Sequence, residues 1–316
     1  MDYPNISVII VNYNSGIRVS ECVASVLRYN PDVEVIVVDN GSSDDSVNQL
    51  LAICPEEPRL HLLCGTKNRG FAAANNSGIS VARGDILLFL NPDCVVEPDT
   101  LALLRETLDS SKDVAMVGGL LMNPDGSEQI GGRRAIPTPW RTFVQVTKLN
   151  RLANRYPRLF ADFNLHKQPL PDSPVEVEAI SGACMAVSRK AYEDVGGMDE
   201  GYFLHCEDLD WCMAFRVKGW KILFDPEARL VHYAGSCSKG RPYFVEWHKH
   251  KGMMRFYRKY FRHQYPGALM WLVTCGVWSR FMLVVSRIYL ARCYAFVRGR
   301  DVKTGGSRSW RDEPSR

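Results

Sequence analysis

The stretch ISVIIVN, residues 6–12, is a short run of mostly β-branched apolar residues, which is typical of a strand buried on both faces of a sheet. Three further runs of this kind are VEVIVVD at 33–39, LHLLC at 60–64 and ILLFL at 86–90. Between them, apolar residues recur at spacings of three and four, which predicts helices at 16–28, 45–53 and 70–82. Alternating strands and helices predict an α/β fold, Rossmann-like, with a mostly parallel central sheet flanked by helices.

Beyond residue 97 the alternation is less regular. We expect a helix at 98–110, a strand at 114–121 and then a loop-rich segment at 122–174, which holds seven prolines and one helix near 140–153. This composition favours a flexible insertion that faces the substrate. Ordered structure is expected again at 175–187, with helices at 189–195 and 208–218 and short strands at 221–224 and 229–232.

The composition excludes a disordered chain, because 46% of the 316 residues are apolar and 23% are charged, enough to bury a substantial core. The ten cysteines include no Cys-x-x-Cys pair, and no apolar run follows a basic start at the N-terminus. We therefore expect neither a zinc ribbon nor a signal peptide, and we infer a reducing, cytoplasmic compartment.

The net charge of +4 conceals a strong asymmetry along the chain. Residues 1–238 carry 22 Lys and Arg against 31 Asp and Glu, whereas residues 239–300 carry 13 against 1. We therefore divide the chain into an acidic body at 1–238, a basic amphipathic helical region at 239–300 and a polar tail at 301–316. A basic segment on an acidic body indicates an anionic surface or substrate.

The basic region contains an apolar helix pattern interrupted by arginines. Its longest uncharged run, 264–279, has 16 residues, fewer than the roughly 20 that a membrane-spanning helix needs. On a helical projection, Arg262, Arg280, Arg287 and Arg298 lie near one line, with apolar residues elsewhere. This pattern favours a helix lying in a membrane interface; the alternative is a core helix packed on the body. Leu, Val and Met dominate beyond Pro266, which suits lipid better than nucleic acid.

Polar residues follow each of the first four predicted strands, where an open parallel sheet usually binds its ligand. They are Asn12-Tyr13-Asn14, Asp39-Asn40-Gly41, Lys67-Asn68-Arg69-Gly70 and Asn91-Pro92-Asp93. The chain has no GxxxxGK(S/T) motif and no GxGxxG after the first strand, which argues against a P-loop NTPase and a conventional dinucleotide dehydrogenase. A divalent cation held by Asp93 could instead anchor a diphosphate.

Five ordered blocks of sequence resemble the family 2 glycosyltransferases of the GT-A fold. The blocks are VIIVNYN, VVDNGSSDDS, NRGFAAANNSGISVARGDILLFLNPD, ISGACMAVSRKAYEDVGGMDEGYFLHCEDLDWCMAFRVKGW and LVHYAG, which together cover about 6–238. The resemblance makes 1–238 a GT-A catalytic domain, with a nucleotide-binding half at 1–121 and an acceptor and catalytic half at 122–238.

The resemblance also implies how a nucleotide-sugar donor is bound. By analogy the donor-binding residues are Val11, Tyr13 and Asp39 at the nucleobase, Asn68, Arg69 and Gly70 along the nucleotide, and Asn91 and Asp93 at the diphosphate. The family's Asp-x-Asp motif binds Mg²⁺ or Mn²⁺, and it corresponds here to Asn91-Pro92-Asp93, which retains one carboxylate. This NPD variant is similar to that of bacterial rhamnosyltransferases that use dTDP-L-rhamnose. His232 resembles a late histidine that some relatives use as a second metal ligand.

The pair Glu207-Asp208 corresponds to the family's ED motif, whose second acid is the catalytic base of inverting transfer. The resemblance therefore implies that Asp208 takes the proton from the acceptor hydroxyl, with Gly182 and Glu207 as acceptor-binding or supporting residues. Acidic residues are also favoured in the first turn of a helix, whatever their chemistry. The QxxRW motif of processive relatives is absent, so we expect transfer of a single sugar.

The expected partners are a nucleotide-sugar donor, a lipid-linked or other glycan acceptor and a membrane surface, with no nucleic acid. A dTDP-sugar is the favoured donor and a UDP-sugar the alternative. The expected location is cytoplasmic, peripheral on the inner face of the membrane. A different class of protein, a non-catalytic nucleotide-sugar-binding anchor of a glycan assembly complex, is the competing hypothesis.

Overall fold

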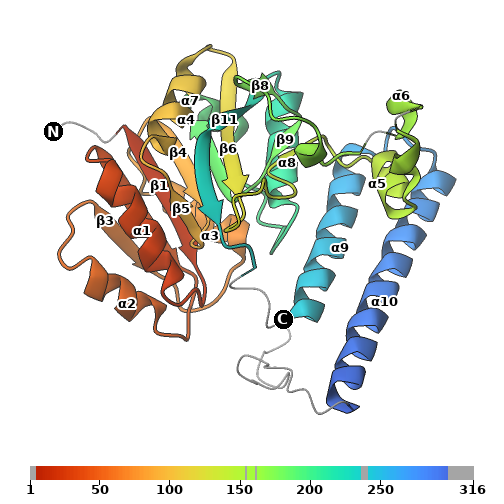
Figure 1. The fold of residues 1–316 in the computed structure, drawn as a ribbon, viewed down its shortest axis with the longest axis horizontal. Helices are drawn as coiled ribbons and strands as arrows, with labels where there is room; N and C mark the ends of the chain where they lie inside the picture. The colour runs from red at the N-terminus through yellow and green to blue at the C-terminus, as the bar shows by residue number, and fades with distance from the viewer. Residues whose placement is uncertain (1–4, 154, 161, 236–240, 298–316) are drawn as a thin grey trace. The chain divides into compact units, whose positions relative to one another are not determined.

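A computed structural model describes residues 5–153, 155–160, 162–235 and 241–297 (Figure 1). The chain forms two compact units, Met1–Ser236 and Cys237–Arg316, which are considered separately below.

The first unit is built on one mixed sheet. Its strands run in the order β3 (Leu60–Cys64), β2 (Val33–Asp39), β1 (Ile6–Asn12), β4 (Ile86–Leu90), β10 (Cys184–Ser188), β6 (Val114–Met122), β11 (Lys221–His232) and β5 (Cys94–Val96), with β8 (Val175–Glu176) beside β11. Strands β3, β2, β1 and β4 are parallel, and β10 runs antiparallel between β4 and β6. The mostly parallel α/β sheet expected from the sequence is confirmed.

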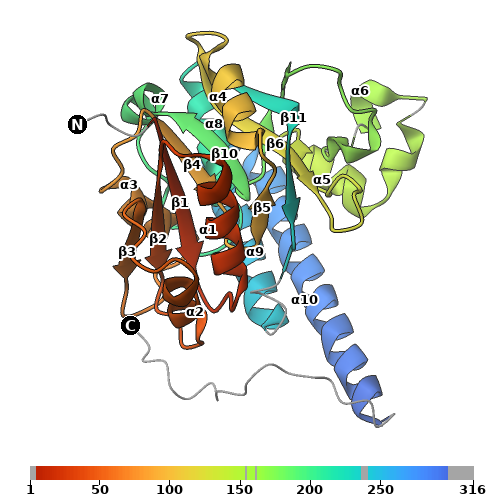
Figure 2. The ribbon, with the colours of Figure 1, turned by 60° about the vertical axis from the view of Figure 1, so that its left-hand side comes forward.

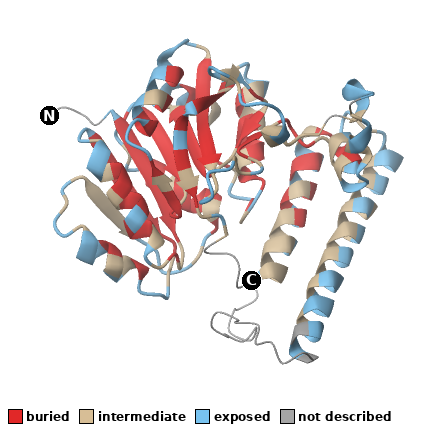
Figure 3. Cartoon of the chain, in the orientation of Figure 1, coloured by how far each residue is buried: buried red, intermediate tan, exposed pale blue. Residues whose placement is uncertain are grey.

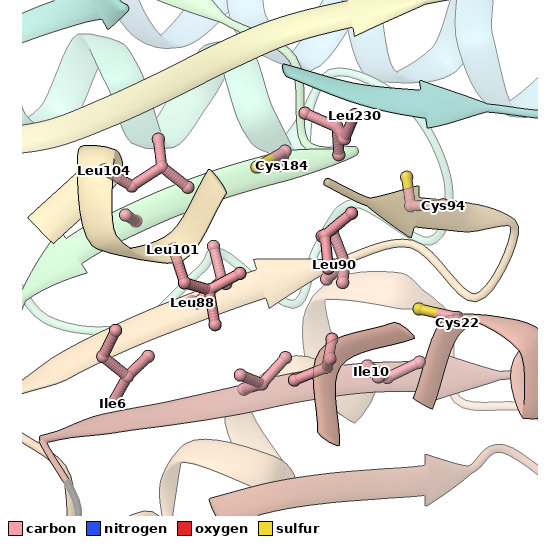
Figure 4. Packing of buried hydrophobic residues seen from close by; sticks show 14 of the residues in the cluster. Ile6, Ile10, Cys22, Leu88, Leu90, Cys94, Leu101, Leu104, Cys184 and Leu230 are labelled. Atoms are coloured by element: carbon pink, nitrogen blue, oxygen red, sulfur yellow. The ribbon is translucent and has the colours of Figure 1, made fainter. Parts of the chain in front are cut away.

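Helices cover both faces of this sheet (Figures 1 and 2). They are α1 (Arg18–Tyr29), α2 (Ser46–Ile53), α3 (Phe71–Ile79), α4 (Thr100–Asp109), α7 (Arg189–Val195) and α8 (Glu207–Val217). Successive side chains of a strand point to opposite faces of the sheet. On one face, Ile10 packs into the same cluster as Leu101 and Leu104 of α4 (Figure 4). On the other face, Phe89 meets Trp211 of α8 edge to face. Most residues of the central strands are therefore buried (Figure 3).

The segment 122–174 is less irregular than expected. It contains β7 (Arg133–Arg134), α5 (Pro139–Val146), the 3-10 turns η1 (Leu149–Leu152) and η2 (Leu165–Lys167), and α6 (Pro157–Phe160), and β7 pairs with β9 (Ala179–Ile180) in a small second sheet. The single helix predicted near 140–153 is wrong in extent. It ends at Val146 because Lys148, at φ 62°, lies in the left-handed region, which a continuing α-helix does not tolerate.

A second correction concerns the end of the sheet, where two short strands were expected at 221–224 and 229–232. They are one strand, β11, whose register against β6 shifts between Asp225 and Arg229. Asp225 stabilises this bulge, because its carboxylate accepts hydrogen bonds from the backbone N–H groups of Glu227 and Ala228 and from the hydroxyl of Thr107.

The described part of the second unit contains two helices, α9 (Pro242–Tyr260) and α10 (Gly267–Val297). The rings of Trp247 and Trp278 pack 5.3 Å apart between these helices, and Arg280 contacts the imidazole of His250. By length and composition, 267–294 is long and apolar enough to cross a membrane, despite the arginines in it. Many of its large apolar side chains are exposed (Figure 3). The predicted polar tail lies outside the described residues.

Candidate active site

The ends of β1 and β2 form one hydrogen-bonded group. Asn12 and Asp39 are paired in register, and Nδ2 of Asn12 donates to Oδ1 of Asp39 at 2.8 Å. The other oxygen of Asp39 accepts from the backbone N–H of Ser42. Val11 is buried beside this pair and Tyr13 is half-buried just beyond it. The three predicted nucleobase residues Val11, Tyr13 and Asp39 therefore come from neighbouring strand ends.

The segment from Asn68 to Gly70 is held against the end of β2 by Asn40. The amide of Asn40 donates to Oδ1 of Asn68 at 3.0 Å and accepts from the backbone N–H of Arg69 at 2.9 Å. Gly70 has φ 89°, and a Cβ there would come within 2.6 Å of the carbonyl oxygen of Phe203, so glycine is required. The Arg69 side chain is half exposed, with Glu200 at 3.5 Å. A solvent-facing cation at this edge can meet an anionic ligand.

The predicted metal ligands lie together. Asp93 follows β4, and β5 pairs with the last residues of β11, which brings Nε2 of His232 to 3.1 Å from Oδ1 of Asp93. On the other side of the ring, Nδ1 of His232 is 2.5 Å from Oε1 of Gln129. Because an amide oxygen only accepts, Nδ1 carries the proton of this contact, and Nε2 is the ring atom that faces Asp93.

This donor set fits a divalent cation. An imidazole nitrogen lone pair on Nε2 and a carboxylate oxygen of Asp93 that face each other attract a cation. Their separation of 3.1 Å matches the distance of about 3 Å between adjacent ligands of octahedral Mg²⁺. The thiol of Cys94 is also within 4.8 Å of this pair. Burial raises its pKa well above the ordinary value, and its Sγ contacts the carbonyl of Ala183, so the thiol is a poor ligand for a hard cation.

The predicted base, Asp208, lies in the first turn of α8. Its Oδ2 accepts hydrogen bonds from Arg134 at 2.5 Å and from the backbone N–H of Gly182 at 3.2 Å, and its Oδ1 accepts from the N–H of Leu209. A Cβ on Gly182 would lie 3.2 Å from that of Asp208, so the missing side chain permits this close approach. Burial alone raises the pKa of Asp208, but the charge and hydrogen bonds around it outweigh burial and hold the pKa below its ordinary value.

The neighbouring acid behaves differently. Glu207 is buried, and its Oε2 has no hydrogen-bond partner among the described residues. Burial, together with the charge of Asp208, raises the pKa of Glu207 to about 8. The two neighbouring acids therefore differ: burial favours the protonated form of Glu207, whereas Arg134 and the N–H donors favour the ionised form of Asp208.

The predicted diphosphate-binding strand end and the predicted base are linked through two adjacent residues, Gly182 and Ala183. The carbonyl of Ala183 accepts from the backbone N–H of Asn91 at 3.0 Å, while the N–H of Gly182 donates to Asp208. This contact places the diphosphate-binding and catalytic residues of the prediction on either side of one turn before β10. Asp210, in contrast, accepts a hydrogen bond from the buried hydroxyl of Tyr202 and serves the fold.

Sequence reasoning did not identify Gln129, Arg134 or Asn40 as site residues. Gln129 and Arg134 belong to the segment expected to be a flexible insertion, and their partners His232 and Asp208 are 103 and 74 residues away. The only signal was a pair of arginines after Gly131-Gly132 in a proline-rich segment, which is also typical of an exposed basic loop.

The fold and this arrangement of strand-end residues define a GT-A glycosyltransferase. The sequence profile of glycosyl transferase family 2 matches residues 7–196, so the chain belongs to that family. It is 27% identical over 238 residues to the N-acetylglucosaminyl-diphospho-decaprenol L-rhamnosyltransferase of Mycobacterium tuberculosis, covering 72% of this chain and 75% of the relative. It is 25% identical over 217 residues to a low-salt glycan biosynthesis hexosyltransferase, Agl10, of Haloferax volcanii, covering 67% and 62%.

Solved structures support the same fold. GalNAc-T7 with UDP, GalNAc and Mn²⁺ superposes with a TM-score of 0.59 at 19% identity, over 81% of this chain and 48% of that chain. The mannosyltransferase PcManGT of Pyrobaculum calidifontis, in complex with GDP-Man and Mn²⁺, superposes with a TM-score of 0.55 at 17% identity, over 94% and 81%.

Proposed function

We propose that this glycosyltransferase is inverting and metal-dependent and transfers one L-rhamnose from dTDP-L-rhamnose to a lipid-linked glycan acceptor at the cytoplasmic face of a membrane. The observation that carries the reaction type is the position of Asp208: its carboxylate accepts a hydrogen bond from Gly182, while the adjacent Ala183 bonds to the backbone of Asn91, at the strand end that also bears Asp93. The choice of dTDP-L-rhamnose as donor rests on the sequence Asn91-Pro92-Asp93 and on the similarity to the rhamnosyltransferase relative.

In this mechanism Asp208 accepts the proton of the acceptor hydroxyl as that oxygen bonds to the anomeric carbon. The bond from the anomeric carbon to the diphosphate breaks, and the nucleoside diphosphate leaves with the electron pair. Asp93 and His232 would hold a divalent cation, which would supply the positive charge that stabilises this leaving group. Arg134 keeps Asp208 ionised before the acceptor arrives, and general base catalysis of this kind contributes typically 10²–10⁴-fold.

The nucleotide-binding residues have separate tasks. Asp39, fixed by Asn12, presents a carboxylate at the predicted nucleobase position, and Asn40 shapes the backbone from Asn68 to Gly70 along the nucleotide. Single-sugar transfer follows from the absence of a QxxRW motif. The apolar, basic second unit would keep the enzyme near a lipid-linked acceptor.

The first test is thermal unfolding of the protein with dTDP, UDP, GDP or ADP, each with and without Mg²⁺ or Mn²⁺. A nucleotide at about a hundred times its dissociation constant stabilises the protein by about 2.7 kcal/mol. We expect a metal-dependent increase in Tm with dTDP alone. An increase confined to UDP would overturn the rhamnose donor, and no increase with any nucleotide would favour the non-catalytic anchor.

A further inference from the structure

The insertion between β7 and β8 presents an apolar face. In α5, Val144 is buried and Arg141 forms a 2.6 Å ion pair with Glu178, which attaches one side of the helix to the body of its unit. Trp140 and Phe143 of the same helix have their rings stacked 5.6 Å apart, and both side chains are about half exposed. The helix is therefore amphipathic, with its aromatic side open to solvent.

The following turns extend this face. The indole N–H of Trp140 donates to the carbonyl of Leu159 at 2.8 Å, which ties α5 to α6. Tyr156 packs edge to face on Phe160, whose ring also contacts that of Trp140. We define the insertion surface as six large apolar side chains between 45% and 57% exposed: Trp140, Phe143, Val146, Leu152, Tyr156 and Leu159.

The charge of the same segment is entirely positive. Residues 139–160 contain no Asp or Glu and five basic residues. One of them, Arg141, is used within the fold. The other four are exposed and form no ion pair within the described part of the chain: Lys148, Arg151, Arg155 and Arg158. In a body whose residues up to 238 have more acids than bases, this is a local reversal of charge.

We propose that the insertion surface binds an anionic lipid bilayer, with the aromatic and aliphatic side chains in the interfacial layer and the four basic side chains at the headgroup phosphates. Exposed apolar side chains interleaved with Lys and Arg match a surface that is anionic outside and apolar beneath. A nucleic acid offers no layer for Leu152, Leu159 and Val146. The inference rests on the proposed function, in which the acceptor is lipid-linked, and adds a membrane contact independent of α10.

Hydrogen–deuterium exchange of the full-length protein tests this surface. Amide exchange is measured without vesicles, with phosphatidylcholine vesicles and with vesicles containing phosphatidylglycerol. We expect anionic vesicles to slow the exchange of amides in 139–160 as well as any in 267–297. In Arg151→Glu/Arg158→Glu, the slowing in 139–160 should fall by about tenfold or more, because each basic residue near an anionic leaflet contributes several-fold to binding.

The matched control is Arg83→Glu/Lys112→Glu, which changes the net charge equally at two exposed residues outside the insertion. This variant should keep the protection of 139–160. Protection of 267–297 without any change in 139–160 would overturn the proposal, as would equal loss in both variants. Protection of 139–160 without lipid, in a protein that light scattering shows to be a dimer, would assign the surface to a second copy. Nucleotide binding is measured separately by thermal unfolding. Failure of the proposed function can therefore be distinguished from failure of this membrane contact.

Discussion

The guanidinium of Arg134 donates a 2.5 Å hydrogen bond to Oδ2 of Asp208, so a half-buried cation lies against the carboxylate proposed as the base. In Arg134→Gln, burial of Asp208 is no longer opposed by this charge, and its pKa should rise. The carboxylate then becomes protonated at a higher pH, so activity should be lost first on the acid side. The measurement is the pH dependence of sugar transfer from the donor to a membrane fraction. Arg134→Lys, which keeps the charge, should restore much of the profile, and an unchanged acid limb in Arg134→Gln would contradict the assignment.

Replacing the base itself should separate binding from chemistry. Asp208→Asn retains the shape of the side chain and leaves the strand-end residues Asp39 and Asp93 in place. We expect nucleotide binding to stay near the wild-type value, while transfer falls by about 10²–10⁴-fold or more. Calorimetric titration with nucleotide and the transfer assay check the two halves of this prediction. Turnover at the wild-type rate would remove Asp208 from the mechanism.

The buried Glu207 should make the protein less stable as pH rises. Its pKa is about 8 in the folded protein and near the ordinary value of 4.5 when unfolded, so the folded state binds more protons between these values. The free energy of unfolding should therefore fall with increasing pH across this window, by up to about 1.4 kcal/mol per pH unit. Glu207→Gln should flatten this dependence. Denaturant unfolding at pH 5, 6, 7 and 8 measures this dependence. The prediction would be refuted if the free energy of unfolding fell equally with pH in the wild type and in Glu207→Gln.

The contact between Gln129 and His232 should control metal affinity. Without the amide oxygen on Nδ1, the ring loses the partner that directs Nε2 towards Asp93. In Gln129→Ala we expect Mn²⁺ binding to weaken by about 10–100-fold, the usual effect of removing a group that orients a metal ligand. Electron paramagnetic resonance of free Mn²⁺ measures this without an activity assay. Arg134→Lys serves as the control and should bind Mn²⁺ as the wild type does.

Removal of the second unit should weaken membrane attachment. A chain truncated before Tyr243 lacks both α9 and the long apolar α10. We expect it to sediment with membranes much less than the full chain does, and to keep a cooperative thermal transition that nucleotide stabilises. If the folded truncated protein stayed fully on membranes, the second unit would have no role in attachment.

The parallel part of the sheet was predictable because each of its strands has a local sequence pattern. Strands β1, β2, β3 and β4 coincide with apolar runs bounded by polar turns, and these turns carry Asp39, Asn68 and Asp93. The antiparallel β10 could not be placed between β4 and β6 from its sequence, since pairing partners depend on contacts made across the whole chain. For the same reason, the continuous β11 was interpreted as two strands.

Within the site, the residues found from the sequence were those that a family motif marks. Arg134 and Gln129 carry no such mark, because a buried arginine or glutamine is informative only once its distant partner is known. The same limit applied to Glu207, whose raised pKa depends on burial that no short motif reveals.

The turn at Gly182 and Ala183 has a consequence for how such enzymes diverge. The backbone N–H of Gly182 donates to Asp208, the proposed base, and the carbonyl of Ala183 accepts from the N–H of Asn91, so a displacement of this turn would move both sides of the proposed site. The proposed donor and acceptor sites are therefore mechanically coupled at this turn. A change of either specificity is expected to begin elsewhere, in segments that touch only one of the two substrates.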